Sequence, residues 1–100
     1  MNDEIIIKPG LISDHGWNFK VSIGGLISNV LLTQDYWKKI THGSISPQDL
    51  VRIALEIVMA RNLAESLPPE FSLDALADRI QNFEHQAKQQ AHAEAAANPR

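Results

Sequence analysis

The chain contains no cysteine, which excludes disulfide bonds, thiolate catalysis and cysteine-based zinc sites together. Aromatic residues make up only 6% of the chain, and no apolar run is long enough for a membrane span. The run Ile5-Ile6-Ile7 ends at Lys8-Pro9, and the residues before it are acidic, where a secretory signal carries positive charge. These absences favour a cytoplasmic protein without a membrane segment.

An excess of basic residues is also absent. The net charge is −3, whereas a nucleic-acid binder usually carries a strongly basic patch. The apolar fraction of 44% and the charged fraction of 21% are typical of a globular protein, and 100 residues are the size of a single domain.

The stretch 17–32 alternates apolar and polar residues on both sides of Gly24-Gly25. If these glycines form a two-residue turn, directly paired residues share a face of the hairpin. One face then holds seven apolar residues and one serine: Trp17, Phe19, Val21, Ile23, Leu26, Ser28, Val30 and Leu32. The other face is mostly polar and holds Asn18, Lys20, Ser22, Ile27, Asn29 and Leu31. The sequence therefore predicts a β-hairpin with one buried face.

A short β-branched strand is predicted at residues 5–8, and two capped helices are predicted after the hairpin. Thr33 is a suitable N-cap for a helix over residues 34–42. Ser46, followed by proline at the first helical position, predicts a second helix over residues 47–62.

A third helix is predicted after Ser72, because apolar residues recur at steps of three and four. This stripe consists of Leu73, Leu76, Ile80, Phe83 and Ala87. Residues 88–100 are rich in alanine and glutamine and have no large apolar residue, which predicts a frayed or disordered tail. The expected architecture is one α+β domain over residues 1–87, with a small antiparallel sheet of about three strands packed by three helices.

No residue pattern indicates a catalytic site, a cofactor or a metal. His85 and His92 are seven residues apart on one predicted helix, whereas a helical metal-binding pair needs a spacing of four and a third ligand. An enzyme is the third hypothesis, and it would require a cleft that combines Tyr36, His42 and an acidic residue.

The helix over residues 47–62 has an apolar arc wider than the stripe of an ordinary surface helix. Surplus apolar surface without convergent polar groups favours a non-catalytic protein-interaction module that self-associates or binds a protein partner. The candidate interaction surface consists of Tyr36, Leu55, Met59 and Leu63.

Two resemblances accompany this interpretation. The Tyr36-Trp37 pair, the segment Ser46–Val51 and Phe71-Ser72-Leu73 follow a strand and a hairpin in an order that resembles a family of small bacterial proteins. That resemblance implies the α+β fold and no particular activity.

The segment Asn29–Thr33 followed by two helices resembles part of a ribbon-helix-helix DNA-binding domain. This resemblance implies that Ile27, Asn29 and Leu31 would face DNA, of which asparagine is a type that reads bases. The alternative function is therefore a DNA-binding or antitoxin-type transcriptional regulator, with nucleic acid as the partner.

Overall fold

One four-stranded sheet organises the computed structural model, which describes residues 5–13 and 15–97. In spatial order its strands are β1 (Ile5–Ser13), β2 (Gly16–Ile23), β3 (Leu26–Thr33) and β4 (Glu70–Ser72). The first three strands are antiparallel, and β4 lies parallel to β3. The predicted α+β class is confirmed, but the sheet is mixed and has a fourth strand that the sequence did not predict.

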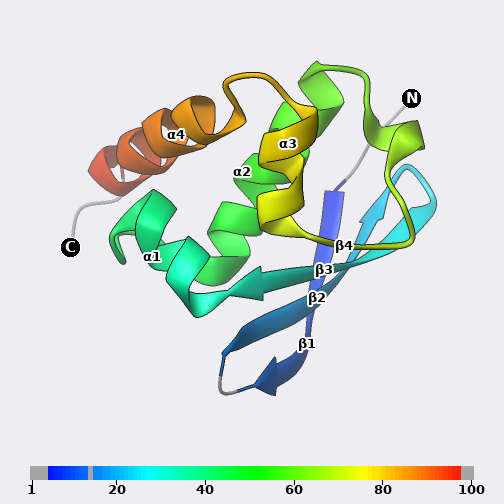
Figure 1. Cartoon of the computed structure of the whole chain (residues 1–100), viewed down its shortest axis with the longest axis horizontal. Coiled ribbons are helices and arrows are strands. Elements are labelled where there is room, and N and C mark those ends of the chain that lie inside the picture. Colours follow the sequence, from blue (N-terminus) through cyan, green and yellow to red (C-terminus); the bar gives the residue numbers. More distant parts are fainter. Residues whose placement is uncertain (1–4, 14, 98–100) are drawn as a thin grey trace.

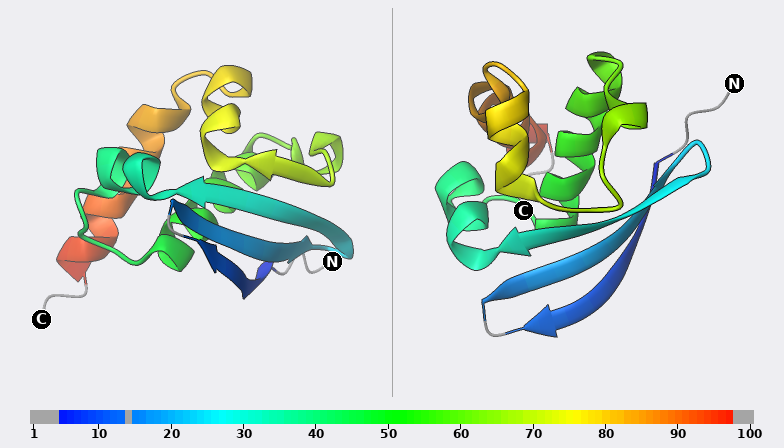
Figure 2. Two further views of the ribbon diagram at one scale, coloured as in Figure 1. Left: turned by 60° about the horizontal axis from the view of Figure 1, so that its bottom comes forward. Right: turned by 45° about the vertical axis from the view of Figure 1, so that its right-hand side comes forward.

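In the described ranges, all the helices lie on one face of this sheet, and no helix covers the opposite face, called the open face below (Figures 1 and 2). They are α1 (Gln34–Thr41), α2 (Pro47–Ala60), α3 (Leu76–Arg79) and α4 (Phe83–Ala97), with short 3₁₀ turns at Ala64–Ser66 and Leu73–Ala75. None of the helices in the described ranges is long and apolar enough to cross a membrane.

The central hairpin has the predicted register. Trp17 lies opposite Leu32, and Ile23 lies opposite Leu26. Gly24-Gly25 forms the turn, with φ angles of 54° and 92°, which glycine adopts without a steric penalty. The alternation of buried and exposed residues along β2 and β3 follows from this register, because neighbouring residues of a strand point to opposite faces.

Side-chain caps begin the two predicted helices. The Thr33 hydroxyl accepts a hydrogen bond from the backbone N–H of Tyr36 at 3.2 Å, and the Ser46 hydroxyl accepts one from Asp49 at 3.1 Å. Helix α2 ends at Ala60, two residues earlier than predicted.

The predicted third helix is divided in the structure. A 3₁₀ turn and α3 end before Ile80, whose backbone is extended, and Asn82 has a positive φ of 63° before α4 begins. Asparagine tolerates this left-handed conformation better than most residues, so the chain can turn there. The predicted apolar stripe is nevertheless entirely buried, and the described residues form four α-helices instead of the predicted three.

The alanine-rich segment differs most from the prediction of a frayed tail beginning at residue 88. Residues 88–97 continue α4, and Ala91 is buried against the rest of the protein. On the same part of the helix, Glu94 forms an ion pair with Arg52 of α2. The end of the predicted tail at 98–100, and residues 1–4 of the predicted domain, lie outside the described residues.

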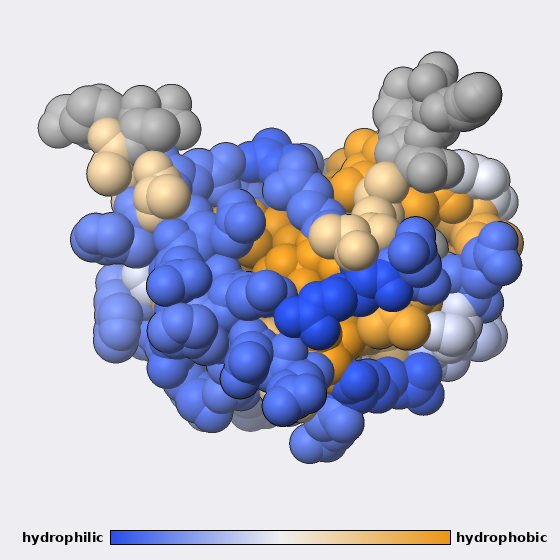
Figure 3. Space-filling model, turned by 90° about the horizontal axis from the view of Figure 1, so that it is seen from above, coloured by the Kyte–Doolittle hydropathy of each residue, from blue (hydrophilic) through white to orange (hydrophobic). Residues whose placement is uncertain are grey.

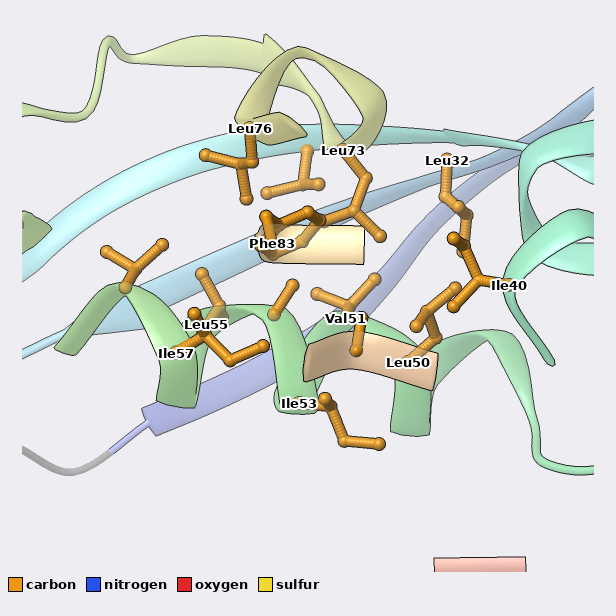
Figure 4. Close-up of a cluster of buried hydrophobic side chains, with 14 of the residues drawn as sticks. Leu32, Ile40, Leu50, Val51, Ile53, Leu55, Ile57, Leu73, Leu76 and Phe83 are labelled. Carbon is orange, nitrogen blue, oxygen red and sulfur yellow. The ribbon is translucent and has the colours of Figure 1, made fainter. Parts of the chain in front are cut away.

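The core fills the space between the sheet and the helices (Figure 4). Helix α2 is its centre, because Leu50, Val51, Leu55 and Val58 have no exposed surface. Leu73 and Leu76, from the segment that follows β4, belong to the same cluster, and Leu32 of β3 contributes to it from the sheet (Figure 4). Burial of so many large apolar side chains provides the main driving force for folding.

Candidate interaction surface

The open face of the sheet carries most of the exposed large apolar side chains. In the part of the chain that the structure describes, Ile6, Ile27, Leu31 and Leu26 are the large hydrophobic residues with high exposure. The first three lie on the open face, whereas Leu26 lies at the turn, opposite Ile23. Ile27 is 58% exposed and Leu31 is 43% exposed, and both belong to β3. These aliphatic side chains therefore share one uncovered face, with the polar residues Ser22 and Asn29 between them.

Polar residues surround these two side chains in regular rows across the strands. One row runs from Lys20 on β2 through Asn29 on β3 to Glu70 on β4. The next row runs from Asn18 through Leu31 to Ser72. Cross-strand partners of a sheet share a face, so every member of both rows lies on the open face.

The charged groups of this face have no ionic partner among the residues that the structure describes. Lys20 and Glu70 are both exposed, and neither forms an ion pair with another described residue. Lys8 of β1 lies directly opposite Lys20, so two like charges are adjacent on the same side of β3. The face is therefore positive on the β1–β2 side and negative on the β4 side.

A hollow of about 310 Å³ lies at the β4 side of this face. It is lined by Asn18, Asn29, Leu31, Glu70, Phe71 and Ser72. Strand β4 is held beside β3 by a hydrogen bond of 2.7 Å from the Asn29 backbone N–H to the Pro69 carbonyl. The Ser28 hydroxyl donates a second bond to the Pro68 carbonyl at 3.1 Å. The uncovered face thus combines protruding aliphatic side chains with an adjacent depression.

The four residues predicted as an interaction surface do not form one surface. Leu55 has no exposed surface, because the apolar arc of α2 packs inside the chain against the sheet, α3 and α4. The expectation that Leu55 contacts a partner is therefore corrected. The arc is wide because α2 is a central helix that is covered on several sides.

Met59 and Leu63 are partly buried and line different hollows on the helix side of the molecule. Met59 lies beside Ile5, Arg52 and Glu56 around a hollow of about 400 Å³. Leu63 lines a more apolar hollow of about 270 Å³ with Val58, Ser66, Leu67, Leu76, Arg79 and Ile80. Figure 3 views the molecule from above the orientation of Figure 1. Apolar surface is visible in the middle of this view, bordered by hydrophilic side chains.

Tyr36, the fourth predicted residue, is buried beneath α4. Its hydroxyl donates a hydrogen bond to Glu84 Oε2 at 3.1 Å, and the Lys39 ammonium lies 3.3 Å from the same oxygen. Burial and the neighbouring Glu84 carboxylate raise the pKa of Tyr36 well above its usual range. His42, the other residue named for a cleft, is the exposed C-cap of α1. The contacts of Tyr36 and Lys39 with Glu84 therefore join α1 to α4.

Another hollow on the helix side, of about 450 Å³, lies between α2 and α4. Its lining is mainly polar and includes Glu56, Arg61, Gln86, Gln89 and Gln90. The Arg61 guanidinium donates a hydrogen bond to the Gln86 side chain at 3.2 Å and one to the Gln81 carbonyl at 3.3 Å. Within the described ranges, no three histidine or acidic side chains are grouped closely enough to hold a metal ion.

Strand β3, which the ribbon-helix-helix resemblance would place in a DNA-reading ribbon, is hydrogen-bonded along both edges. Strand β2 occupies one edge and β4 occupies part of the other. A ribbon with a second subunit would require β4 to leave. The face expected to meet DNA, with Ile27, Asn29 and Leu31, is nevertheless the uncovered face.

The alternation of residues contained the signal for this surface. It placed Ile27 and Leu31 on the polar face of the hairpin, where two large aliphatic side chains are unexpected. It could not place Glu70 and Ser72 in the same rows, since β4 was not predicted. Comparison with known protein families, with curated proteins and with solved structures finds no match for this chain.

Proposed function

We propose that the protein is a non-catalytic interaction module that self-associates through the open face of its sheet. The observation that carries this proposal is the exposure of Ile27 and Leu31 on a face that no helix covers. Full burial of such a side chain is worth about 1.5–3 kcal/mol relative to full exposure, and covering the exposed part of both residues contributes a share of this to association.

A second copy of this chain is the partner that the charges favour. Lys20 lies one strand from β3 in one direction, and Glu70 lies one strand from β3 in the other. A face with opposite charges on the two sides of its centre can complement a second identical face. A strongly basic or acidic partner would match only one half of it.

The size of the face indicates a weak association. Eight residues of β3 and the width of three strands give a contact of roughly 27 Å by 14 Å. Two such faces bury less than the approximately 1,200 Å² that marks the lower end of stable complexes. The dimer is therefore expected to form reversibly and to depend on protein concentration.

Sedimentation velocity over a range of about 10 µM to 1 mM tests self-association, because weak interfaces dissociate in this range. The wild type should shift from monomer to dimer, and Leu31→Asp should stay monomeric because it places a charge in the contact. Leu26→Asp is the matched control, since Leu26 is similarly exposed at 48% but does not lie on the open face. A wild-type protein that remains monomeric throughout would contradict the proposal.

The alternative function, a DNA-binding or antitoxin-type regulator, has one supporting observation. Lys8 and Lys20 lie side by side on the open face, where ammonium groups could contact phosphates. A gel shift at low salt is the most permissive test, because phosphate attraction is strongest there. Binding that Lys20→Glu removes would favour this alternative over self-association.

The proposed setting is the cytoplasm of a bacterium. The absence of cysteine suits a reducing compartment, and Ser46–Val51 and Phe71–Leu73 carry the resemblance to small bacterial proteins. Fractionation of bacterial cells that express the tagged full chain tests the location: the protein should be recovered with cytoplasmic markers.

A further inference from the structure

The two rows of side chains on the open face are centred on β3. Lys20 and Glu70 flank Asn29 in one row, and Asn18 and Ser72 flank Leu31 in the next. Building on the proposed self-association, we infer that two copies meet face to face about a two-fold axis. This axis runs parallel to β3, over the middle of the strand and midway between the two sheets. This inference specifies which residues of the two copies meet.

Rotation by 180° about an axis along β3 exchanges the two sides of the sheet. It places β2 of one copy over β4 of the other, and each residue keeps its position along the strands. Lys20 therefore faces Glu70 of the partner subunit, and by symmetry Glu70 faces the partner's Lys20. Each of the two charged groups gains an ionic partner that it lacks among the described residues of its own chain.

The side chains of β3 itself lie on the axis and meet their own copies. Ile27 contacts the partner's Ile27, and Leu31 contacts the partner's Leu31. The hollow of about 310 Å³ beside Leu31 provides space for the partner's leucine. An isologous interface needs a projection and a depression on the same face, and this face has both.

The remaining polar residues of the two rows also find suitable partners. Asn18 reaches the partner's Ser72, an amide facing a hydroxyl, and the two Asn29 amides meet on the axis. Aligned packing of two twisted sheets keeps their strands within about 30° of each other, which preserves these pairings near the axis.

Other two-fold arrangements satisfy fewer of these groups. An axis across the strands at Asn29 places Lys20 over the partner's Lys20 and Glu70 over the partner's Glu70, so like charges meet. An axis between β2 and β3 pairs Lys8 with the partner's Glu70 but leaves Ile27 over the partner's Ser22. Of these three arrangements, the axis parallel to β3 alone matches both the apolar and the charged residues.

Charge reversal in sedimentation experiments at moderate salt, where charges outside the contact are screened, tests the axis. Lys20→Glu and Glu70→Lys should each weaken the dimer about tenfold, because every dimer loses two opposite-charge contacts and gains two like-charge contacts. The combined Lys20→Glu/Glu70→Lys variant restores opposite charges across the interface. Its dissociation constant should return to within about threefold of the wild-type value.

Lys8→Glu is the matched control for the charge reversals. It makes the same change in net charge on the same face, but β1 lies outside the overlap of the two sheets. Ile6→Asp is the control for Leu31→Asp, since both side chains are 43% exposed on the open face. Neither control should change the dissociation constant by more than about twofold at moderate salt.

The outcomes separate the axis from self-association itself. A wild-type protein that stays monomeric overturns both. If Leu31→Asp dissociates the dimer, self-association through the open face is supported. If Lys20→Glu and Lys8→Glu then weaken the dimer equally, the proposed position of the axis is wrong. Rescue of Lys8→Glu by Glu70→Lys would place the axis between β2 and β3. Circular dichroism of each variant confirms that the fold is retained.

Discussion

The Tyr36 hydroxyl is the most strongly perturbed acidic group among the described residues. Its pKa is raised by burial and by Glu84, so the folded protein holds the phenolic proton more tightly than the unfolded chain. The unfolded state loses this proton above about pH 10, while the folded state retains it. We therefore expect the ionisation of Tyr36 to leave the free energy of unfolding unchanged below pH 10 and to lower it above pH 10, by up to about 1.4 kcal/mol per pH unit.

Urea unfolding between about pH 8 and 11 measures this effect, with Tyr36→Phe as the comparison. The variant should lose the alkaline fall that tyrosine contributes and should be less stable than the wild type at neutral pH, because Glu84 loses a hydrogen bond. Tyr36 is the only tyrosine of the chain, so the absorbance of tyrosinate reports its ionisation directly. Ionisation of the folded protein at an ordinary tyrosine pKa would contradict the buried contact.

Gly16 is required by the close approach of β2 to β3. A Cβ at this position would overlap the Leu32 carbonyl oxygen and lie 2.7 Å from the Thr33 Cα. Both obstacles are backbone atoms, so a side-chain rotation cannot relieve the overlap. Gly16→Ala is expected to destabilise the fold by about 1–3 kcal/mol and to lower Tm by several degrees. Ser22→Ala, on the same strand, should change Tm far less, and equal effects would show that this contact is unimportant.

At the scale of elements, the hairpin was predictable residue by residue, whereas β4 was not. Alternation over sixteen residues fixes the register of β2 and β3, because a slip of one would place Phe19 and Val30 in water. Glu70–Ser72 spans only three residues, which is too short for alternation to be recognised. That strand exists because β3 offers it an edge, which is information from tertiary structure.

Helix α4 shows a different difficulty, since the small residues that follow Ala87 gave no sign of burial. Alanine provides little apolar area, and it is buried only where another element approaches closely, as at Ala87 and Ala91. Removal of residues 88–100 deletes Ala91 and the ion pair from Glu94 to Arg52. We expect this truncation to destabilise the protein by about 1–3 kcal/mol in urea unfolding. Removal of residues 98–100 alone is the control. If both truncated chains were as stable as the full chain, residues 88–97 would contribute nothing to folding, as expected of a frayed tail.

At the scale of the whole molecule, the sequence identified surplus apolar surface but not what covers it. Helical periodicity showed a wide arc on α2, and the prediction assigned part of it, including Leu55, to a partner. The structure covers this arc from within the chain. Ile27 and Leu31 belong to a face that no helix reaches, because α1 to α4 all lie on the other side. Which face of a sheet is covered depends on the chain path, and local patterning does not specify it.

Self-association should also be visible in thermal stability. A partner that binds only the folded chain stabilises it by mass action, so Tm should rise with protein concentration. Above the dissociation constant we expect a rise of about 3 °C or more for each tenfold increase in concentration. Leu31→Asp removes the contact, and its Tm should be independent of concentration. Scanning calorimetry at several concentrations provides the measurement, and a constant Tm for the wild type would mean that the folded chain acts as a monomer.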